Sequence, residues 1–161
     1  MRQTNNYKGF SLIELLIVVA IIGIIAAIAI PNLLASRRAA NEGSAQSSVR
    51  LLHTAETIYC ATAGNGNYGD VATLQTAGFI DAKLGSGTKS GYTFTATTDN
   101  ITTPHNFFAV GVPADTAQFS RTGHRSFTVA EDGVMRGKLT DAGPANHGEA
   151  INAATWPPLD K

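Results

Sequence analysis

A single acidic residue, Glu14, lies in an otherwise apolar stretch near the N-terminus of this 161-residue chain. The stretch runs from Phe10 to Ile30, and Ser11 is its only other strongly polar member. A carboxylate inside a lipid bilayer costs about 2.5 to 3.5 kcal/mol on insertion scales, so it needs a compensating partner. We expect no such partner within the stretch itself. Glu14 is therefore the residue whose chemistry most needs an explanation.

A second pair of residues, Gly9 and Phe10, suggests where that partner comes from. If the chain is cut between Gly9 and Phe10, the new N-terminal ammonium lies on Phe10, four residues before Glu14. A neighbouring copy of the chain can then place its ammonium beside the Glu14 carboxylate, so the charge is compensated in a polymer. The alternative is that Glu14 is protonated, or that its side chain reaches toward the membrane interface.

The apolar stretch that carries Glu14 has the length of a membrane span. Its 21 residues extend about 31 Å as a helix, which matches the hydrocarbon core of a bilayer. Unlike a secretory signal, the stretch is long and passes into a helical pattern without a small-residue cleavage site, so we expect it to remain in the mature protein. Arg2 and Lys8 precede it, which predicts a cytoplasmic N-terminus and an external C-terminal domain.

Residues 8 to 16, Lys-Gly-Phe-Ser-Leu-Ile-Glu-Leu-Leu, closely resemble the leader-peptide junction of type IV prepilins and their relatives. The following run, Val18 to Pro31, also resembles the membrane span of that family, and the close likeness covers about residues 8 to 40. The resemblance implies that residues 1–9 are a leader peptide, which prepilin peptidase removes after Gly9 before it methylates the amine of Phe10. It also implies that Glu14 recruits and registers each incoming subunit.

Two residues weaken the helix that we expect over residues 10–31. Pro31 cannot donate a hydrogen bond to the carbonyl of Ala27, and its ring crowds that turn, so the sequence predicts a kink or local melting there. Gly23 weakens the same stretch. We hypothesise that this softening lets subunits lengthen and repack as they leave the bilayer; the alternative is that Pro31 marks the membrane edge. Small residues at helical spacing, Ala20, Gly23 and Ala27, favour a bundled filament core.

Beyond Pro31, residues 32–63 are predicted to continue the helix in amphipathic form. Gly64-Asn65-Gly66-Asn67 then ends it, so the whole helix would be about 80 Å long, which suits a filament better than a compact monomer. The stripe expected to pack on a sheet consists of Ala45, Val49, Leu52, Ala55, Ile58 and Tyr59. The opposite, solvated or subunit-facing side carries Arg37, Arg38, Glu42, Gln46, Ser47, Arg50 and His53.

Residues 64–161 are predicted to form a globular head. Asp70 is expected to cap a short helix through Thr76. Strand-like segments follow at residues 92–97, 107–112, 126–130 and 134–138, the last two joined by a turn at Asp132-Gly133. The fold class is thus α+β, a long N-terminal transmembrane helix packed against an antiparallel meander of about four strands, which resembles the type IVa pilin head. Residues 139–161 are expected to form an irregular tail anchored by Trp156, without the cysteine pair that staples this region in many relatives.

Composition and motifs exclude several other classes of protein. Removal of residues 1–9 leaves 10 basic and 12 acidic residues, so the chain is not a strongly basic nucleic-acid protein. We find no phosphate-binding loop, nucleophile elbow or zinc signature, and expect neither an enzyme nor a cofactor. His53, Glu56 and Cys60 share a helix face but are expected to be packing and surface residues. The acids of the C-terminal region, Asp132, Asp141, Glu149 and Asp160, are too scattered for a calcium loop.

The leading hypothesis is a major subunit of a type IV pilus, which polymerises with itself through its N-terminal helix. By resemblance, its partners are prepilin peptidase, the bilayer before assembly, an inner-membrane assembly platform and cytoplasmic motor ATPases. The resemblance implies adhesion, twitching motility or DNA uptake as possible uses of the filament. One alternative is a pseudopilin of type II secretion. Another is a minor pilin with a binding role in its head, although the only close basic cluster, Arg121, His124 and Arg125, is typical of a solvated turn.

Overall fold

A computed structural model describes residues 9–101, 105–117 and 120–159 of the chain. The chain divides into two compact units between Ser36 and Arg37, and the first helix, α1 (Leu12–Ala61), contributes residues to both. Residues 1–8 of the predicted leader peptide, with Arg2 and Lys8, lie outside the described residues, as does Asp160. The two units are described separately below.

The first unit consists of the N-terminal half of α1 and the residues that lead into it. The helix begins at Leu12 and stays α-helical at Gly23 and at Pro31. The local melting considered for this stretch is therefore not seen in the single chain. A softening of the helix during assembly stays a hypothesis, because it concerns subunits in a filament.

The second unit contains an antiparallel sheet in which neighbours in the sequence are neighbours in the sheet, with the order β1-β2-β3-β4-β5. The strands are β1 (Thr88–Lys89), β2 (Tyr92–Asp99), β3 (Asn106–Pro113), β4 (Ser126–Ala130) and β5 (Arg136–Lys138). The α+β class and the meander are confirmed, with one more strand than the four expected. The extra strand, β1, turns into β2 through Ser90 and Gly91, both at positive φ as a tight hairpin requires.

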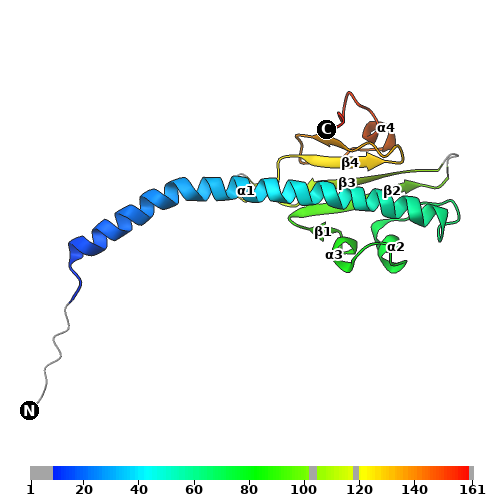
Figure 1. Cartoon of the computed structure of the whole chain (residues 1–161). Coiled ribbons are helices and arrows are strands. Elements are labelled where there is room, and N and C mark those ends of the chain that lie inside the picture. Colours follow the sequence, from blue (N-terminus) through cyan, green and yellow to red (C-terminus); the bar gives the residue numbers. More distant parts are fainter. Residues whose placement is uncertain (1–8, 102–104, 118–119, 160–161) are drawn as a thin grey trace, which may run out of the picture. The chain divides into compact units, whose positions relative to one another are not determined.

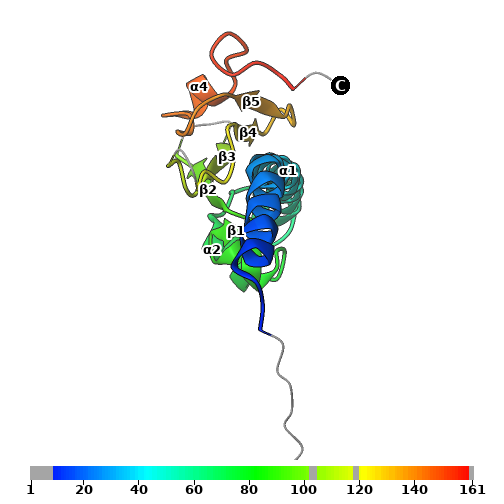
Figure 2. The same cartoon turned by 90° about the vertical axis from the view of Figure 1, so that its left-hand side faces the viewer.

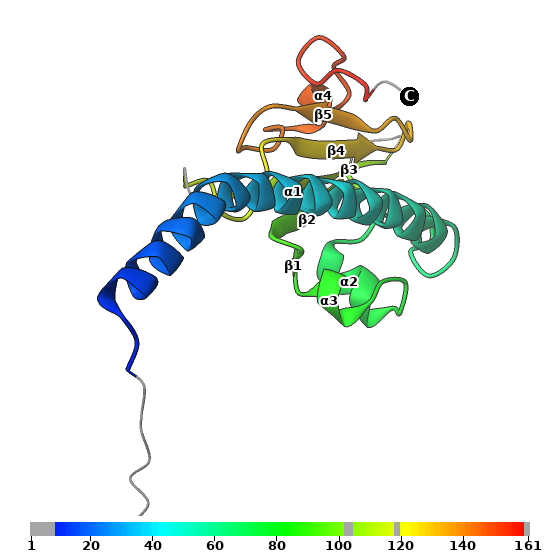
Figure 3. The same cartoon turned by 60° about the vertical axis from the view of Figure 1, so that its left-hand side comes forward.

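One face of the sheet packs against residues 37–61 of α1 (Figures 1 and 3). The core stripe on the helix is confirmed for four members, Ala45, Val49, Leu52 and Ala55. The prediction was wrong for Ile58, which is 45% exposed, because at 3.6 residues per turn it lies about a third of a turn from the centre of the stripe. Glu56 occupies the central place instead, four residues after Leu52.

Two short helices connect α1 to the sheet, α2 (Val71–Thr76) and α3 (Ala82–Gly85). The predicted cap is confirmed, because an Asp70 carboxylate oxygen accepts a hydrogen bond from the Thr73 N–H at 2.7 Å. Asp81 caps α3 in the same way through the Leu84 N–H. In each helix the aspartate satisfies a backbone donor that has no partner within the helix.

The C-terminal tail is held without a disulfide. A fourth helix, α4 (His147–Ala150), places Ala150 in a small apolar cluster with Phe108 of β3 and Ala130 of β4. Figure 2 shows α4 beside the β5 end of the sheet, apart from α1. Farther along, Trp156 is only 1% exposed, which supports the expectation that it anchors the tail.

Backbone hydrogen bonds then tie the last described residues to the edge of the sheet. The Gly137 N–H donates to the Pro157 carbonyl at 3.1 Å, and the Leu159 N–H donates to the Met135 carbonyl at 3.0 Å. These bonds cover the free edge of β5, which would otherwise present unpaired backbone groups. The tail is therefore a packed part of the head and more ordered than the sequence suggested.

Replacing Trp156 with alanine should destabilise the head by about 3 to 5 kcal/mol, because a large buried aromatic side chain is removed and the tail loses its anchor. Chemical denaturation of the full-length protein in detergent micelles, followed by circular dichroism, measures the change. Leu139→Ala is the matched control in the same tail. Its side chain is 76% exposed, so its loss should cost less than about 0.5 kcal/mol. Equal effects of the two substitutions would contradict the anchoring role.

Candidate functional site

Glu14 lies in the first turn of α1, and its side chain contacts the backbone of the residue that precedes the helix. The backbone N–H of Ser11 donates to Glu14 Oε2 at 2.9 Å. Ser11 directly precedes Leu12, so Glu14 is the third helical residue, and the Ser-x-x-Glu spacing is that of a capping box. The expectation that the apolar stretch offers Glu14 no partner was therefore wrong. The Ser-x-x-Glu spacing in the sequence already favours this hydrogen bond.

This local bond leaves Glu14 only partly compensated. An N–H group is a dipole that carries no net charge, so it does not neutralise a carboxylate in an apolar surround. Within the described part of the chain, no hydrogen bond to Glu14 Oε1 is seen. Among the described residues, the local cap therefore engages one of the two carboxylate oxygens.

Gly9 and Phe10 precede the helix in non-helical backbone, and both are exposed. A Cβ atom added at Gly9 would meet nothing within 4 Å, and the Phe10 side chain is 88% exposed. The bond between Gly9 and Phe10 therefore lies in exposed, non-helical backbone.

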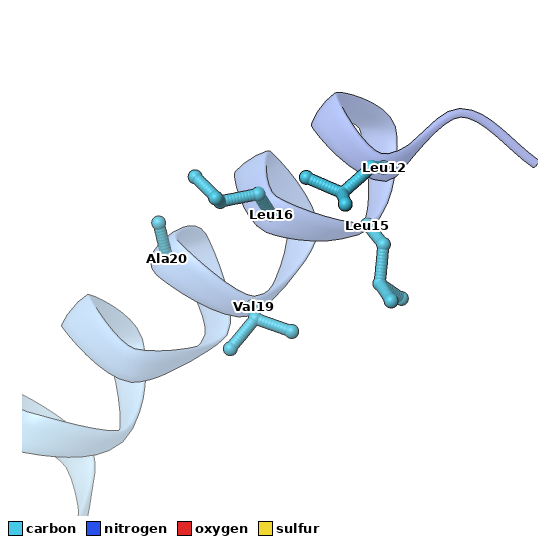
Figure 4. Close-up of a pocket in the computed structure, with 5 residues that line it drawn as sticks. All are labelled: Leu12, Leu15, Leu16, Val19 and Ala20. Atoms are coloured by element: carbon cyan, nitrogen blue, oxygen red, sulfur yellow. The ribbon is translucent and has the colours of Figure 1, made fainter.

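The surface that follows Glu14 is apolar on all sides of α1. Among the described residues, α1 is the one helix long and apolar enough to cross a membrane, and none of its most apolar segment is buried. Figure 4 shows side chains of its first turns projecting from the helix with no other segment over them. They line a shallow open hollow formed by Leu12, Leu15, Leu16, Val19 and Ala20.

Removing this surface from water would stabilise the protein. Burying one large aliphatic side chain stabilises a structure by about 1.5 to 3 kcal/mol relative to leaving it in water. The large side chains exposed between Phe10 and Leu33 are Phe10, Leu12, Ile13, Leu15, Leu16, Ile17, Val18, Val19, Ile21, Ile22, Ile24, Ile25, Ile28, Ile30 and Leu33. Lipid or the same helix in other copies would remove them from water.

The three potential metal ligands on the later part of α1 serve separate purposes. The His53 ring packs on Phe107 with ring centroids 5.9 Å apart. Glu56 is buried and accepts a hydrogen bond from the Gly69 N–H at 3.0 Å, whereas Cys60 is a half-buried free thiol. Within the described ranges, no group of three or more histidine, cysteine or acidic side chains could hold a metal ion.

The acids considered for calcium binding are also engaged separately. Asp132 forms an ion pair with Arg136, and Asp141 forms one with Arg121. Glu149 accepts a hydrogen bond from the Ala145 N–H at 2.8 Å. Asp160, the fourth of these acids, lies outside the described residues.

The basic cluster of the head is tied to α1. Arg121 and Arg38 both approach the ring of His124, at 3.2 Å and 3.0 Å, and the His124 N–H donates to Glu42 Oε1 at 2.8 Å. Asn41 donates to the Thr122 carbonyl in the same region. Arg38 and Glu42 were predicted to face solvent or other subunits, so this docking of residues 122–124 onto α1 was missed.

Comparison with known proteins places the N-terminal site in a family. The profile of the prokaryotic N-terminal methylation motif matches residues 4–30. The major component of the type IV narrow pilus of Thermus thermophilus is 34% identical over 116 residues, which cover 72% of this chain and 89% of that protein. The chain belongs to the type IV pilin family. No solved structure shows a significant match.

Shorter matches link this pilin to two kinds of system. The major component of the Thermus thermophilus type IV wide pilus is 70% identical over 38 residues, or 24% of this chain. The type II secretion system core protein G of Escherichia coli is 36% identical over 59 residues, or 37% of this chain. The matches span only 29% and 41% of the lengths of these two relatives.

Proposed function

We propose that this pilin is the major subunit of a type IV pilus, made as a membrane-bound precursor and assembled through its N-terminal helix. The observation that carries the proposal is the uncovered apolar half of α1, whose first turn presents Glu14 five residues after Gly9. The geometry suits a subunit that is stored in lipid and then transferred to a bundle of identical helices. The filament would serve adhesion, motility or DNA uptake.

The first step in this proposal is processing. Residues 1–9 are the leader peptide, and prepilin peptidase cuts after Gly9 and methylates the amine of Phe10. The exposed backbone at Gly9 and Phe10 supports this step. Cutting here removes Arg2 and Lys8 and creates a cation directly before the apolar helix.

The second step is the pairing of charges between subunits. In a filament, the Phe10 amine of one copy lies beside the Glu14 carboxylate of its neighbour. Glu14 Oε2 keeps the local bond to the Ser11 N–H, and Oε1 receives the amine. An ion pair in an apolar surround is sensitive to the loss of either partner, at about 3 to 5 kcal/mol, because the remaining charge stays buried. This sensitivity would make assembly selective for correctly registered subunits.

The remaining parts of α1 form the spine and its connection to the head. Residues 10–31 form the filament core, where Gly23 and Pro31 allow the helix to soften, and residues 32–63 carry the helix into the head of residues 64–161. Before assembly the protein crosses the inner membrane once with its N-terminus in the cytoplasm. An inner-membrane platform and cytoplasmic motor ATPases then move it into a surface filament.

A type II secretion pseudopilin is the second candidate, favoured by the similarity to core protein G. The match to the narrow-pilus component covers twice as large a share of this chain, 72% against 37%, so the head favours the pilus. Shearing the producing cells and identifying the released filaments by mass spectrometry separates the two. Abundant surface filaments of this chain support a pilus, whereas their absence together with lost protein secretion on gene deletion supports a pseudopilin.

Replacing Glu14 with alanine or with glutamine should leave membrane insertion intact and prevent filament assembly. Glutamine keeps an oxygen that can accept from the Ser11 N–H, so a loss in Glu14→Gln isolates the charge from the local cap. A loss of about 3 kcal/mol per contact lowers subunit association more than a hundredfold. Quantifying pilin in sheared and membrane fractions tests this, and normal filament yield from Glu14→Gln would refute the charge pair.

Replacing Gly9 with tryptophan should stop processing and leave the longer precursor in the membrane, because the fold has room at this position but the peptidase requires glycine. Intact-mass analysis of the membrane fraction distinguishes the precursor from the mature chain. Gly43→Ala is the control, since Gly43 lies on α1 and also has nothing within 4 Å of an added Cβ. Mature protein of normal mass from the Gly9 variant would exclude this cleavage position.

A further inference from the structure

Glu56 is the one acidic residue in the described part of the chain that has no exposed surface at all. It lies on α1 among Leu52, Ala55 and the apolar side chains of the sheet, in the main core of the head. Its Oε2 accepts the hydrogen bond from the Gly69 N–H at 3.0 Å. Its Oε1 is buried, and no described residue donates to it. A carboxylate placed in this way has half of its hydrogen-bonding capacity unused.

Gly69 belongs to the loop of residues 64–70, which leads from the end of α1 to α2. On the opposite side, the loop is held by Asn100, whose side chain exchanges two hydrogen bonds with the Tyr68 backbone, at 2.9 Å each. His105 Nδ1 contacts the Gly66 carbonyl at 2.9 Å. The loop is therefore held at two places. Glu56 holds it from the core, and Asn100 and His105 hold it from the side of the sheet.

The groups around Glu56 do not compensate a negative charge. Asp70 acts on Glu56 as a like charge. Hydrogen bonds from the Thr73 hydroxyl and N–H hold the pKa of Asp70 below its ordinary value, so Asp70 is anionic at neutral pH. Tyr68 and Cys60 face the same region, and burial together with Cys60, Glu131 and Glu56 raises the pKa of Tyr68, which stays neutral. His53, one turn earlier on α1, packs against Phe107 of β3.

Burial raises the pKa of Glu56 from 4.5 to about 7, and the Asp70 carboxylate adds to that shift while the Gly69 hydrogen bond opposes it. Desolvation outweighs the single hydrogen bond because only one of the two oxygens has a donor. Near neutral pH, the Glu56 carboxyl group is therefore protonated in only a part of the molecules.

We propose that Glu56 is a proton-dependent latch for the loop of residues 64–70. In the protonated state the neutral side chain fits the core, and its second oxygen still accepts from Gly69. In the deprotonated state a buried anion with one donor, near the anionic Asp70, loosens the packing of the loop against α1. The latch belongs to the head and does not depend on whether the chain assembles into filaments.

The sign of the pH effect follows from the raised pKa. The folded state binds the proton more tightly than the unfolded state, so the stabilisation is fully present below about pH 4.5 and is lost as the pH rises to about 7. Within that window, one proton is taken up on folding. The equilibrium constant for opening this region should therefore rise by about tenfold per pH unit.

The test uses the processed full-length pilin in detergent micelles, labelled with ¹⁵N. The amide shift of Gly69 should titrate with a midpoint near pH 7. Hydrogen exchange of the amides of residues 64–70, corrected for the intrinsic pH dependence of exchange, should show protection that falls by about tenfold per unit between pH 5 and pH 7. A Gly69 amide that shows no such midpoint in the wild-type protein overturns the proposal without any variant.

Glu56→Gln removes the ionisable proton and keeps the shape and the acceptor for Gly69, so both pH effects should disappear. Glu42→Gln is the matched control, because Glu42 is also on α1 and also accepts from a backbone N–H, that of His124, but is only half-buried. It should keep the wild-type pH dependence. A specific role for Glu56 would be contradicted if the protection of residues 64–70 still fell with pH in Glu56→Gln. It would also be contradicted if this pH dependence vanished equally in Glu42→Gln.

Discussion

The structure depends on one constraint: the N-terminal half of α1 exposes an apolar surface that no other residue of its own compact unit covers within the described part of the chain. In water this surface would drive association without regard to register. Glu14, in the first turn, restricts what the surface can accept, because any environment that buries the helix must also compensate a carboxylate. In the proposed assembly, the apolar side chains thus supply most of the driving force, and the single charge supplies the specificity.

The head differs from the N-terminal half of α1, because the apolar side chains of its sheet are covered by residues of the same chain. Residues 45–55 of α1 fill one face of the sheet, while α4 and the tail cover part of the other. Trp156 and the backbone bonds to β5 hold the tail in the absence of a disulfide. The same helix is therefore apolar all round in its first half and apolar on one stripe in its second, as the two environments require.

Sequence patterns predicted the elements with strong local signals. The three longer strands were located to within about two residues, and the Asp70 cap was identified from its residue type and position. The two-residue β1 and the one-turn helices α3 and α4 were missed, because such short elements are defined by tertiary contacts more than by propensity. The stripe on α1 was misjudged at Ile58 and Glu56, since hydrophobicity favoured the isoleucine while the helical period placed the acid in the core. For the candidate site, the motif predicted roles for Gly9, Phe10 and Glu14, whereas the Ser-x-x-Glu spacing that favours the hydrogen bond from Ser11 to Glu14 was overlooked.

The central claim concerns the position of one charge relative to the next subunit. An electron cryomicroscopy map of filaments made of this chain would test it directly, at a resolution that shows side chains. The map should show residues 10–31 bundled at the filament axis, with the Phe10 amine of each subunit within about 4 Å of a Glu14 carboxylate of a neighbour. A filament in which Glu14 faces solvent, or in which the apolar helices lie apart from one another, would contradict the claim.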